Sequence, residues 1–243
     1  MASNDDDTTL LGLLRGLTLP LVSLEDGDEF PRHSASGFVL QRDERCHLIS
    51  AAHEIASGRW FVELDVFQGA KPALLVPLTC TWSVLASLDG SGSARSVDLA
   101  WAEIDVEGLR KQAKAESKLN DVKIQIPVYK GPLDVYPDPE EAFSLHAFNK
   151  AVGEKHPGIR CLERRPAAEM AMTYVGDVDD AEAYRFKLSR QHQGHYYYCG
   201  ASGAPISDST GRIVSILLRG NKETSELLGA RLAAYASLIG AIE

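Results

Sequence analysis

The sequence lacks the features of a secreted or membrane-embedded protein. Only four of its 243 residues are cysteine, and none share CxxC spacing, which is too few for a disulfide-rich secreted scaffold. No apolar run approaches the length needed to cross a bilayer. The first seven residues, Met-Ala-Ser-Asn-Asp-Asp-Asp, are opposite in sign to the basic start of a secretory signal. We therefore expect free thiols, a cytoplasmic location and no membrane partner.

The sequence also lacks an excess of positive charge. Its 25 basic side chains face 34 acidic ones, which leaves a formal net charge of −9, and there is no basic tract. Affinity for nucleic acid rests largely on neutralising phosphates, and anionic lipid surfaces repel an acidic protein. We therefore exclude nucleic acid as a partner. With 44% apolar and 24% charged residues, the chain is expected to fold as one large β domain or two small ones.

Short β-type runs separated by turn signals dominate the chain. Runs this short and closely spaced are typical of a sandwich or a barrel. In the first half we expect strands at Leu17–Leu24, Gly37–Leu40, Cys46–Ser50, Trp60–Leu64, Ala73–Val76, Thr81–Leu85 and Leu99–Ile104. In the second half we expect strands at Phe143–Phe148, Ala171–Val175, Tyr184–Leu188, Ala204–Ser207 and Arg212–Leu218. The two halves join near residues 121–140.

Two segments read as helical and one as irregular. Gly108–Asn120 is rich in Lys, Ala and Glu, which favours a surface helix or a long connection. Ser225–Ile242 is expected to form an amphipathic terminal helix, because its apolar residues recur at helical spacing: Leu227, Leu228, Leu232, Tyr235, Ile239 and Ile242. The first seven residues are polar and are expected to lack regular structure.

Three short segments carry the residue types of nucleophilic acyl transfer. Leu48–His53 is expected to be an apolar strand ending in a histidine. Ser96–Trp101 places one acid, Asp98, at the start of an otherwise apolar strand, and Gly200–Pro205 holds Ser202 among small residues. A serine hydroxyl needs a base to take its proton before it can attack an amide. A neutral imidazole can do this near pH 7, and a carboxylate behind it fixes the tautomer and stabilises the imidazolium.

These segments resemble the catalytic motifs of chymotrypsin/trypsin-like serine peptidases of the cysteine-poor bacterial, HtrA-like kind. The matching motifs lie at Ser50–His53, Asp98–Ala100 and Gly200–Pro205, in the order His, Asp, Ser, with spacings of 45 and 104 residues. The resemblance implies an all-β fold of two six-stranded antiparallel barrels with a C-terminal helix. It implies one domain over residues 1–243, with the first barrel at about 17–120, a linker at about 121–140 and the second barrel with its helix at about 141–243.

The resemblance also implies a role for each site residue. Ser202 would be the nucleophile, His53 the general base and Asp98 its orienting partner, with Ser202 Oγ in hydrogen-bond reach of His53. The backbone N–H groups of Gly200 and Ser202 would form the oxyanion hole. The residues that would pair with a protein or peptide substrate are Ser215, Ile216 and Leu217. The implied activity is an intracellular serine endopeptidase that works through an acyl-enzyme, without metal or cofactor.

Chain order argues against a rival fold. Gly200–Ala204 is similar to the Gly-x-Ser-x-Gly elbow of α/β-hydrolases, but in those enzymes the histidine follows the serine. The last histidine here is His195, which precedes Ser202. The α/β-hydrolase alternative therefore lacks a base.

Several positions depart from the family pattern. Ala201 stands where secreted trypsin relatives carry the aspartate that receives a newly cut N-terminus. The alternative function is therefore a latent or inactive peptide-binding module, which an activating protein partner would switch on. Tyr196 falls where trypsin keeps its pocket acid and Leu217 where it keeps a pocket glycine, so cleavage after Arg or Lys is not expected. The run Tyr196–Tyr198 is interpreted as strand and pocket wall.

One further cluster resembles a metal site only superficially. His192, His195 and Cys199 have a spacing that could hold zinc, but no fourth ligand is apparent. We interpret His192 and His195 as parts of a solvated loop and Cys199 as a small buried hydrophobic residue.

Overall fold

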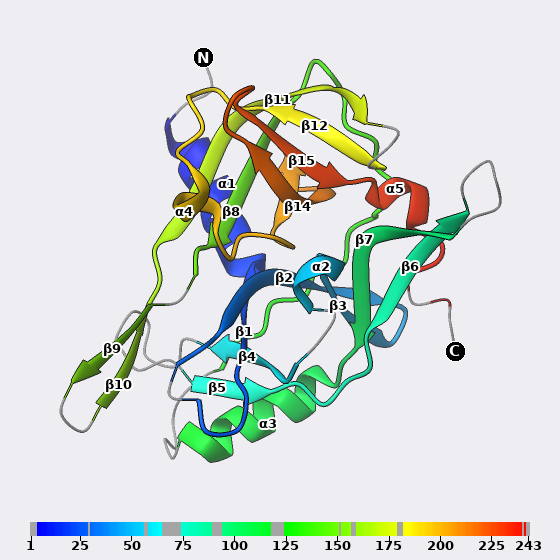
Figure 1. Cartoon of the computed structure of the whole chain (residues 1–243). Helices are drawn as coiled ribbons and strands as arrows, with labels where there is room; N and C mark the ends of the chain where they lie inside the picture. The colour runs from blue at the N-terminus through cyan, green and yellow to red at the C-terminus, as the bar shows by residue number, and fades with distance from the viewer. Residues whose placement is uncertain are drawn as a thin grey trace.

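Most strands of the chain form two antiparallel systems (Figure 1). The computed structural model describes residues 4–28, 30–55, 58–64, 74–88, 94–117, 124–150, 152–156, 159–178, 182–239 and 241. The first system is a seven-stranded sheet in the order β5-β4-β1-β2-β3-β7-β6. Its strands are β1 (Leu19–Ser23), β2 (His33–Arg42), β3 (Arg45–Ser50), β4 (Trp60–Leu64), β5 (Leu74–Pro77), β6 (Ser83–Leu88) and β7 (Ala94–Glu103).

The second system is a closed six-stranded barrel in the order β11-β12-β15-β14-β13-β8. Its strands are β8 (Ala142–Phe148), β11 (Pro166–Val178), β12 (Ala183–Lys187), β13 (Pro205–Asp208), β14 (Ile213–Asn221) and β15 (Glu226–Ala230). A separate hairpin, β9 (Val152–His156) with β10 (Ile159–Glu163), extends away from both halves in Figure 1.

The expected all-β architecture is confirmed in part. One six-stranded barrel closes as predicted, but the expectation of a first closed barrel is wrong, because that half is a seven-stranded sheet with β5 and β6 as its edges. In the described part of the chain these edge strands pair only with β4 and β7. Closing this sheet would need β5 to pair with β6; helix α3 (Val106–Ser117) packs on β5 instead.

The chain ends differ from their sequence-based expectations. Helix α1 (Asn4–Leu17) begins within the first seven residues, which are expected from the sequence to lack regular structure; its Leu14 is fully buried and Thr18 Oγ1 lies 2.9 Å from the His146 carbonyl of the barrel. The terminal helix predicted from Ser225 is wrong over its first half. Glu226–Ala230 is strand β15, and among the described residues of this segment only α5 (Leu232–Tyr235) is helical. Pairing of β15 with both β12 and β14 outweighs the helical spacing of its leucines.

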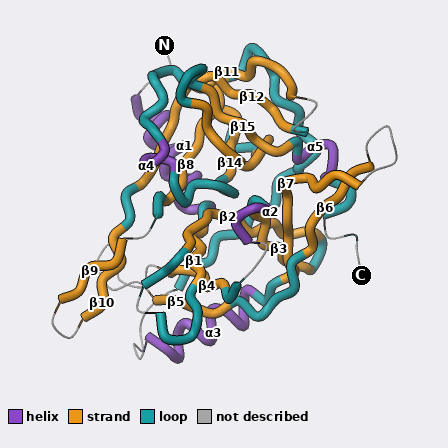
Figure 2. Tube along the Cα trace, viewed as in Figure 1, coloured by secondary structure: helices purple, strands orange, loops and turns teal. Residues whose placement is uncertain are grey.

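The helix expected at Gly108–Asn120 is confirmed as α3, although residues 118–120 lie outside the described part of the chain, as does Ile242. Figure 2 shows α1 and α3 beside the strands of the two halves. Among the described helices, none is both long and apolar enough to span a membrane.

A shared core joins the two halves. Phe38, Ile49 and Trp101 of the first sheet form one buried cluster with Ile216 and Leu232 of the second half. The C-terminal segment adds a polar contact, because Arg42 Nη1 donates to the Ile239 carbonyl at 2.9 Å. Burial of this cluster therefore depends on both halves being folded.

A loop of the barrel also docks directly on the first sheet. The backbone N–H of Ser36 in β2 donates to the Ser202 carbonyl at 2.8 Å, and its hydroxyl donates to the Gly200 carbonyl at 3.0 Å. Ser50 Oγ donates to the Ser36 carbonyl at 2.8 Å. Gly203 has a φ of +88°, and a Cβ there would lie 2.0 Å from the Ser36 carbonyl oxygen. The approach of the two halves therefore requires glycine at 203.

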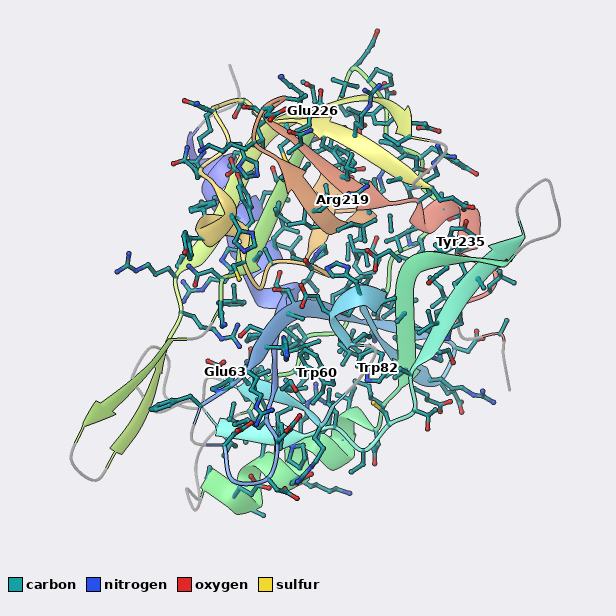
Figure 3. The ribbon with its side chains drawn as sticks, in the orientation of Figure 1. Trp60, Glu63, Trp82, Arg219, Glu226 and Tyr235 are labelled. Carbon is teal, nitrogen blue, oxygen red and sulfur yellow. The ribbon has the colours of Figure 1, made fainter. Side chains whose placement is uncertain are left out.

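A buried ion pair fastens the base of the hairpin to the first sheet. Glu63, labelled in Figure 3, lies on β4, and its Oε2 is 2.5 Å from Nε of Arg164, which follows β10. The two side chains are only 10% and 5% exposed. Arg164 Nη1 also donates to the Asn149 carbonyl at 3.2 Å. Removing one partner would leave the other charge buried and unpaired.

Arg164→Met should lower the free energy of unfolding by about 3–5 kcal/mol, because Glu63 would keep its burial and lose its counter-ion. Adding Glu63→Gln should recover part of that loss. The neighbouring exposed Arg165→Met is the matched control, with an expected change within about 0.5 kcal/mol. Urea unfolding measures all three, and equal losses for the two arginine variants would contradict the ion pair's importance.

Gly203→Ala should destabilise the fold by about 2–4 kcal/mol, since a left-handed φ and an overlap with backbone add together. Gly27→Ala is the control, because Gly27 has a φ of +91° but open space around its Cβ position. Its expected loss is about 1 kcal/mol. The comparison by urea unfolding isolates the contact between the halves, and similar losses would show that this contact is not tight.

Candidate active site

His53 lies on a single helical turn where the two halves meet. Helix α2 (Ala52–Ile55) follows β3, and Figure 1 shows it at the junction between the first sheet and the barrel. Ala52 and Ile55 are 5% and 2% exposed and anchor the turn in the core of the first sheet. The side chain of His53, between them, is 43% exposed. Small buried residues before the histidine therefore bring its ring to the surface of the junction.

Asp98 of β7 holds both the ring and the backbone of His53. Its Oδ2 lies 2.7 Å from His53 Nδ1, and its Oδ1 accepts the backbone N–H of His53 at 2.9 Å. The structure thus brings together the two residues that the sequence predicts as base and orienting acid. Because a carboxylate only accepts, Nδ1 carries a proton and Nε2 is the nitrogen left for other chemistry.

Ser202 follows a tight turn whose third position, Gly200, has the positive φ that favours glycine. Cys199 has φ −62° and ψ 120°, Gly200 has φ +88°, and the Ala201 N–H donates to the Tyr198 carbonyl at 2.9 Å. These angles are those of a type II turn with glycine at its third position. The turn places Ser202 directly beside the contact with Ser36.

The same loop leaves two N–H groups free. The Cys199 carbonyl accepts from the Lys150 N–H, and the Ala201 carbonyl accepts from the Ala204 N–H at 3.0 Å. In a trans peptide the N–H points opposite to the carbonyl, so the N–H groups of Gly200 and Ser202 point away from these partners. Within the described chain, neither N–H donates a hydrogen bond. They are the groups that the sequence predicts as an oxyanion hole.

The Ser202 hydroxyl does not make the contact expected of it. Ser202 Oγ donates to the Leu218 carbonyl at 3.2 Å. Among the described residues, no hydrogen bond joins it to His53. Instead, His53 Nε2 lies 3.2 Å from Oε1 of Glu54, the next residue in the chain. The structure therefore places the predicted nucleophile and base at one junction, each with another partner.

The two carboxylates change the electrostatics of the ring. Hydrogen bonds to Asp98 and then to Glu54 raise the pKa of His53 to about 9, against the opposing effect of partial burial. Burial acts to raise the pKa of Asp98, but its hydrogen bonds to the ring and backbone of His53 outweigh that effect and lower it. The resting pair at neutral pH is therefore an imidazolium and a carboxylate.

The residues predicted to pair with substrate lie in the barrel core. Ser215, Ile216 and Leu217 are 0–1% exposed. Ser215 and Ile216 pair with β13, and Leu217 pairs with Gly229 of β15. That prediction is wrong, because these residues already have neighbours within the barrel. The expected strand ends at Leu218, whereas β14 continues to Asn221.

The outer end of β14 is the free edge instead. Pairing with β13 reaches only Ile216, whereas β14 continues through Arg219, which Figure 3 labels, to Asn221. In the described part of the chain, residues 219–221 pair only with β15. The edge of residues 219–221 that faces away from β15 is therefore unpaired. It continues the strand from Leu218, whose carbonyl contacts Ser202.

The predicted pocket residues are also placed differently. Tyr196 lies on helix α4 (His195–Tyr198) rather than on a strand, and it is 91% exposed, so it does not wall a pocket. His192, expected in a solvated loop, is 7% exposed and packs against Tyr198, with ring centroids 4.4 Å apart and the ring planes tilted by 43°. A Cβ on Gly220 would lie 2.3 Å from His192 Nε2. His192 therefore fills the space beneath the free edge, and burial lowers its pKa.

Two residues of the site were missed by sequence reasoning. Ser36 lies on β2, and its contacts with the Ser202 loop are invisible in the sequence. Glu54 had a local signal, because it is the one acidic residue in the run from Leu48 to Ile55 and stands beside the predicted base. Among the described residues, no group of three His, Cys, Asp or Glu side chains could hold a metal ion.

Comparisons with known proteins bear on the fold. No protein-family model matches the chain, and no curated protein sequence matches it. Among solved structures, the catalytically active tobacco etch virus protease complexed with product matches with a TM-score of 0.50 and 14% identity, over 91% of this chain and 75% of that one. The Rv3671c protease from M. tuberculosis, in its active form, matches with a TM-score of 0.47 and 14% identity, over 97% and 85%.

The serine endoprotease from Yersinia pestis matches with a TM-score of 0.49 and 12% identity, over 95% of this chain. The present chain spans 65% of the length of that protein. At such identities the likeness concerns the backbone alone. The closed barrel, the antiparallel sheet and the likeness to the tobacco etch virus protease together show that the chain has a chymotrypsin-like fold.

Proposed function

We propose that the protein is a serine endopeptidase with Ser202, His53 and Asp98 as its catalytic residues. The observation that carries the proposal is the His53–Asp98 pair, 2.7 Å between Nδ1 and Oδ2, at the junction that also holds Ser202. The match in fold to a protein described as a catalytically active protease supports a peptidase. Its cleaved bond would be a peptide bond of a protein or peptide substrate.

The proposed reaction uses each of these groups in turn. Ser202 Oγ attacks the substrate carbonyl carbon while its proton passes to Nε2 of neutral His53, and Asp98 stabilises the resulting imidazolium. The Gly200 and Ser202 N–H groups donate to the oxygen that becomes negative. His53 then returns the proton to the leaving amine, which forms an acyl-enzyme. Water, deprotonated by the same imidazole, releases the acid product and restores Ser202.

Substrate binding would use the free edge of β14. An extended peptide can add to an exposed strand edge through main-chain hydrogen bonds, which gives affinity without sequence preference. Residues 219–221 follow Leu218, whose carbonyl accepts from Ser202, and in the described part of the chain they pair only with β15, so their other edge is open. The side chain beneath Gly220 is that of buried His192, whose pKa is lowered by burial, and not a carboxylate that would bind Arg or Lys. We therefore propose cleavage that is not directed to Arg or Lys.

The setting we propose is the cytoplasm. The thiols of Cys46, Cys80 and Cys199 are free, as a reducing compartment requires. The formal net charge of −9 supports a protein or peptide partner rather than nucleic acid.

A second candidate function, a latent peptide-binding module, is favoured by one observation. Ser202 Oγ donates to Leu218 and His53 Nε2 faces Glu54, so the two groups that must meet are each engaged elsewhere. An activating protein partner would then have to change this arrangement. In this function the free edge of β14 still binds peptide, and Ser202→Ala leaves the biological activity unchanged.

Covalent labelling separates the two functions. A fluorophosphonate probe should modify Ser202 in the folded protein, and Ser202→Ala should abolish the adduct in a mass spectrum. Labelling should accelerate as pH rises toward about 9, because only neutral His53 can take the serine proton. A folded protein that forms no adduct at Ser202 anywhere in this range would refute an autonomous peptidase and leave the binding module.

A further inference from the structure

Glu54 and Asp98 lie at opposite nitrogens of the same imidazole. Asp98 Oδ2 is 2.7 Å from Nδ1, and Glu54 Oε1 is 3.2 Å from Nε2 of His53. The Glu54 side chain is only 24% exposed, so the contact is partly shielded from water. Nε2 is the atom to which Ser202 would have to deliver its proton.

This arrangement favours the charged form of the ring. With Nδ1–H donated to Asp98, neutral His53 would present the Nε2 lone pair to the oxygens of Glu54, which is repulsive. Protonation turns that contact into a charge-assisted hydrogen bond. A cationic ring has no lone pair for a base to use, so Glu54 competes directly with Ser202 for Nε2.

The position of Ser202 agrees with this competition. Its hydroxyl donates to the Leu218 carbonyl at 3.2 Å rather than to the ring. Imidazolium can only donate at Nε2, so it cannot accept a hydrogen bond from a hydroxyl. The contact of Ser202 with Leu218 and the contact of His53 with Glu54 therefore belong to the same resting arrangement.

We propose that Glu54 is a positioning residue that holds His53 as an imidazolium and thereby withholds the general base from Ser202. The inference rests on the proposed peptidase function. Catalysis then requires the Glu54 carboxylate to leave Nε2. This would follow from a rise in pH, which deprotonates the ring, or from a movement of the Glu54 side chain. The residue acts on the reaction only through His53.

The pH dependence follows from the groups that face the ring. These are Asp98 from β7 and Glu54 from α2 itself. With the pKa of His53 raised to about 9, about one molecule in a hundred carries the neutral ring at pH 7. Activity should therefore rise with pH up to about 9 in the native protein.

Glu54→Gln tests the proposal, because it keeps the size of the side chain and removes its charge. The second-order rate of fluorophosphonate labelling at pH 7 should rise about tenfold or more, since each unit of lowered pKa increases the neutral fraction about tenfold. At a pH above about 9 the variant and the native protein should react alike. Glu103→Gln, an exposed change on β7, is the matched control and should leave the profile unchanged.

A second measurement does not depend on activity. In a Ser202→Ala background, the midpoint of the His53 ring titration, followed by nitrogen-15 NMR, should fall when Glu54→Gln is added. Unchanged midpoints and unchanged pH profiles would overturn the role of Glu54. Absence of labelling in every variant, together with a lowered midpoint, would instead overturn the peptidase function and support the Glu54 contact.

Discussion

The contact between Ser36 and the loop 200–203 is the constraint on which the site depends. The backbone and hydroxyl of Ser36 hold two carbonyls of that loop, and Gly203 has no side chain because the Ser36 carbonyl occupies its place. This docking brings Ser202 of the barrel to the sheet that carries His53 and Asp98. Within the same loop the carbonyls of Cys199 and Ala201 accept from Lys150 and Ala204, and the opposite N–H groups, of Gly200 and Ser202, have no partners among the described residues.

The ends of the chain reinforce that junction from both sides. Helix α1 precedes the first sheet yet packs on the barrel, and the segment after β15 returns to Arg42 of the first sheet. The N-terminal segment of the chain therefore packs on the second half, and the C-terminal segment packs on the first half. The proposed site between the halves needs such support, because the groups proposed to react come from separate hydrogen-bonded systems that could otherwise shift.

The parts of the candidate site that the sequence predicts are the local ones. His53, Asp98 and Ser202 stand in short motifs, and the predicted strand Trp60–Leu64 coincides with β4 because its aromatic and β-branched residues favour a strand locally. Sequence reasoning failed where a partner decides the outcome. The leucines of β15 have helical spacing but pair with two strands, and Ser215–Leu217 lie inside the barrel because β14 runs three residues further than expected. The reach of Glu54 to Nε2 depends on a side-chain direction that no spacing encodes.

The proposed catalysis requires Ser202, the two free N–H groups and His53 Nε2 to converge on one substrate carbonyl. A crystal structure of the fluorophosphonate adduct tests this convergence. We expect phosphorus bound to Ser202 Oγ, a phosphoryl oxygen within hydrogen-bond distance of the Gly200 and Ser202 N–H groups, and Glu54 displaced from His53 Nε2. An adduct whose phosphoryl oxygen points away from those N–H groups, with Glu54 still on the ring, would contradict it.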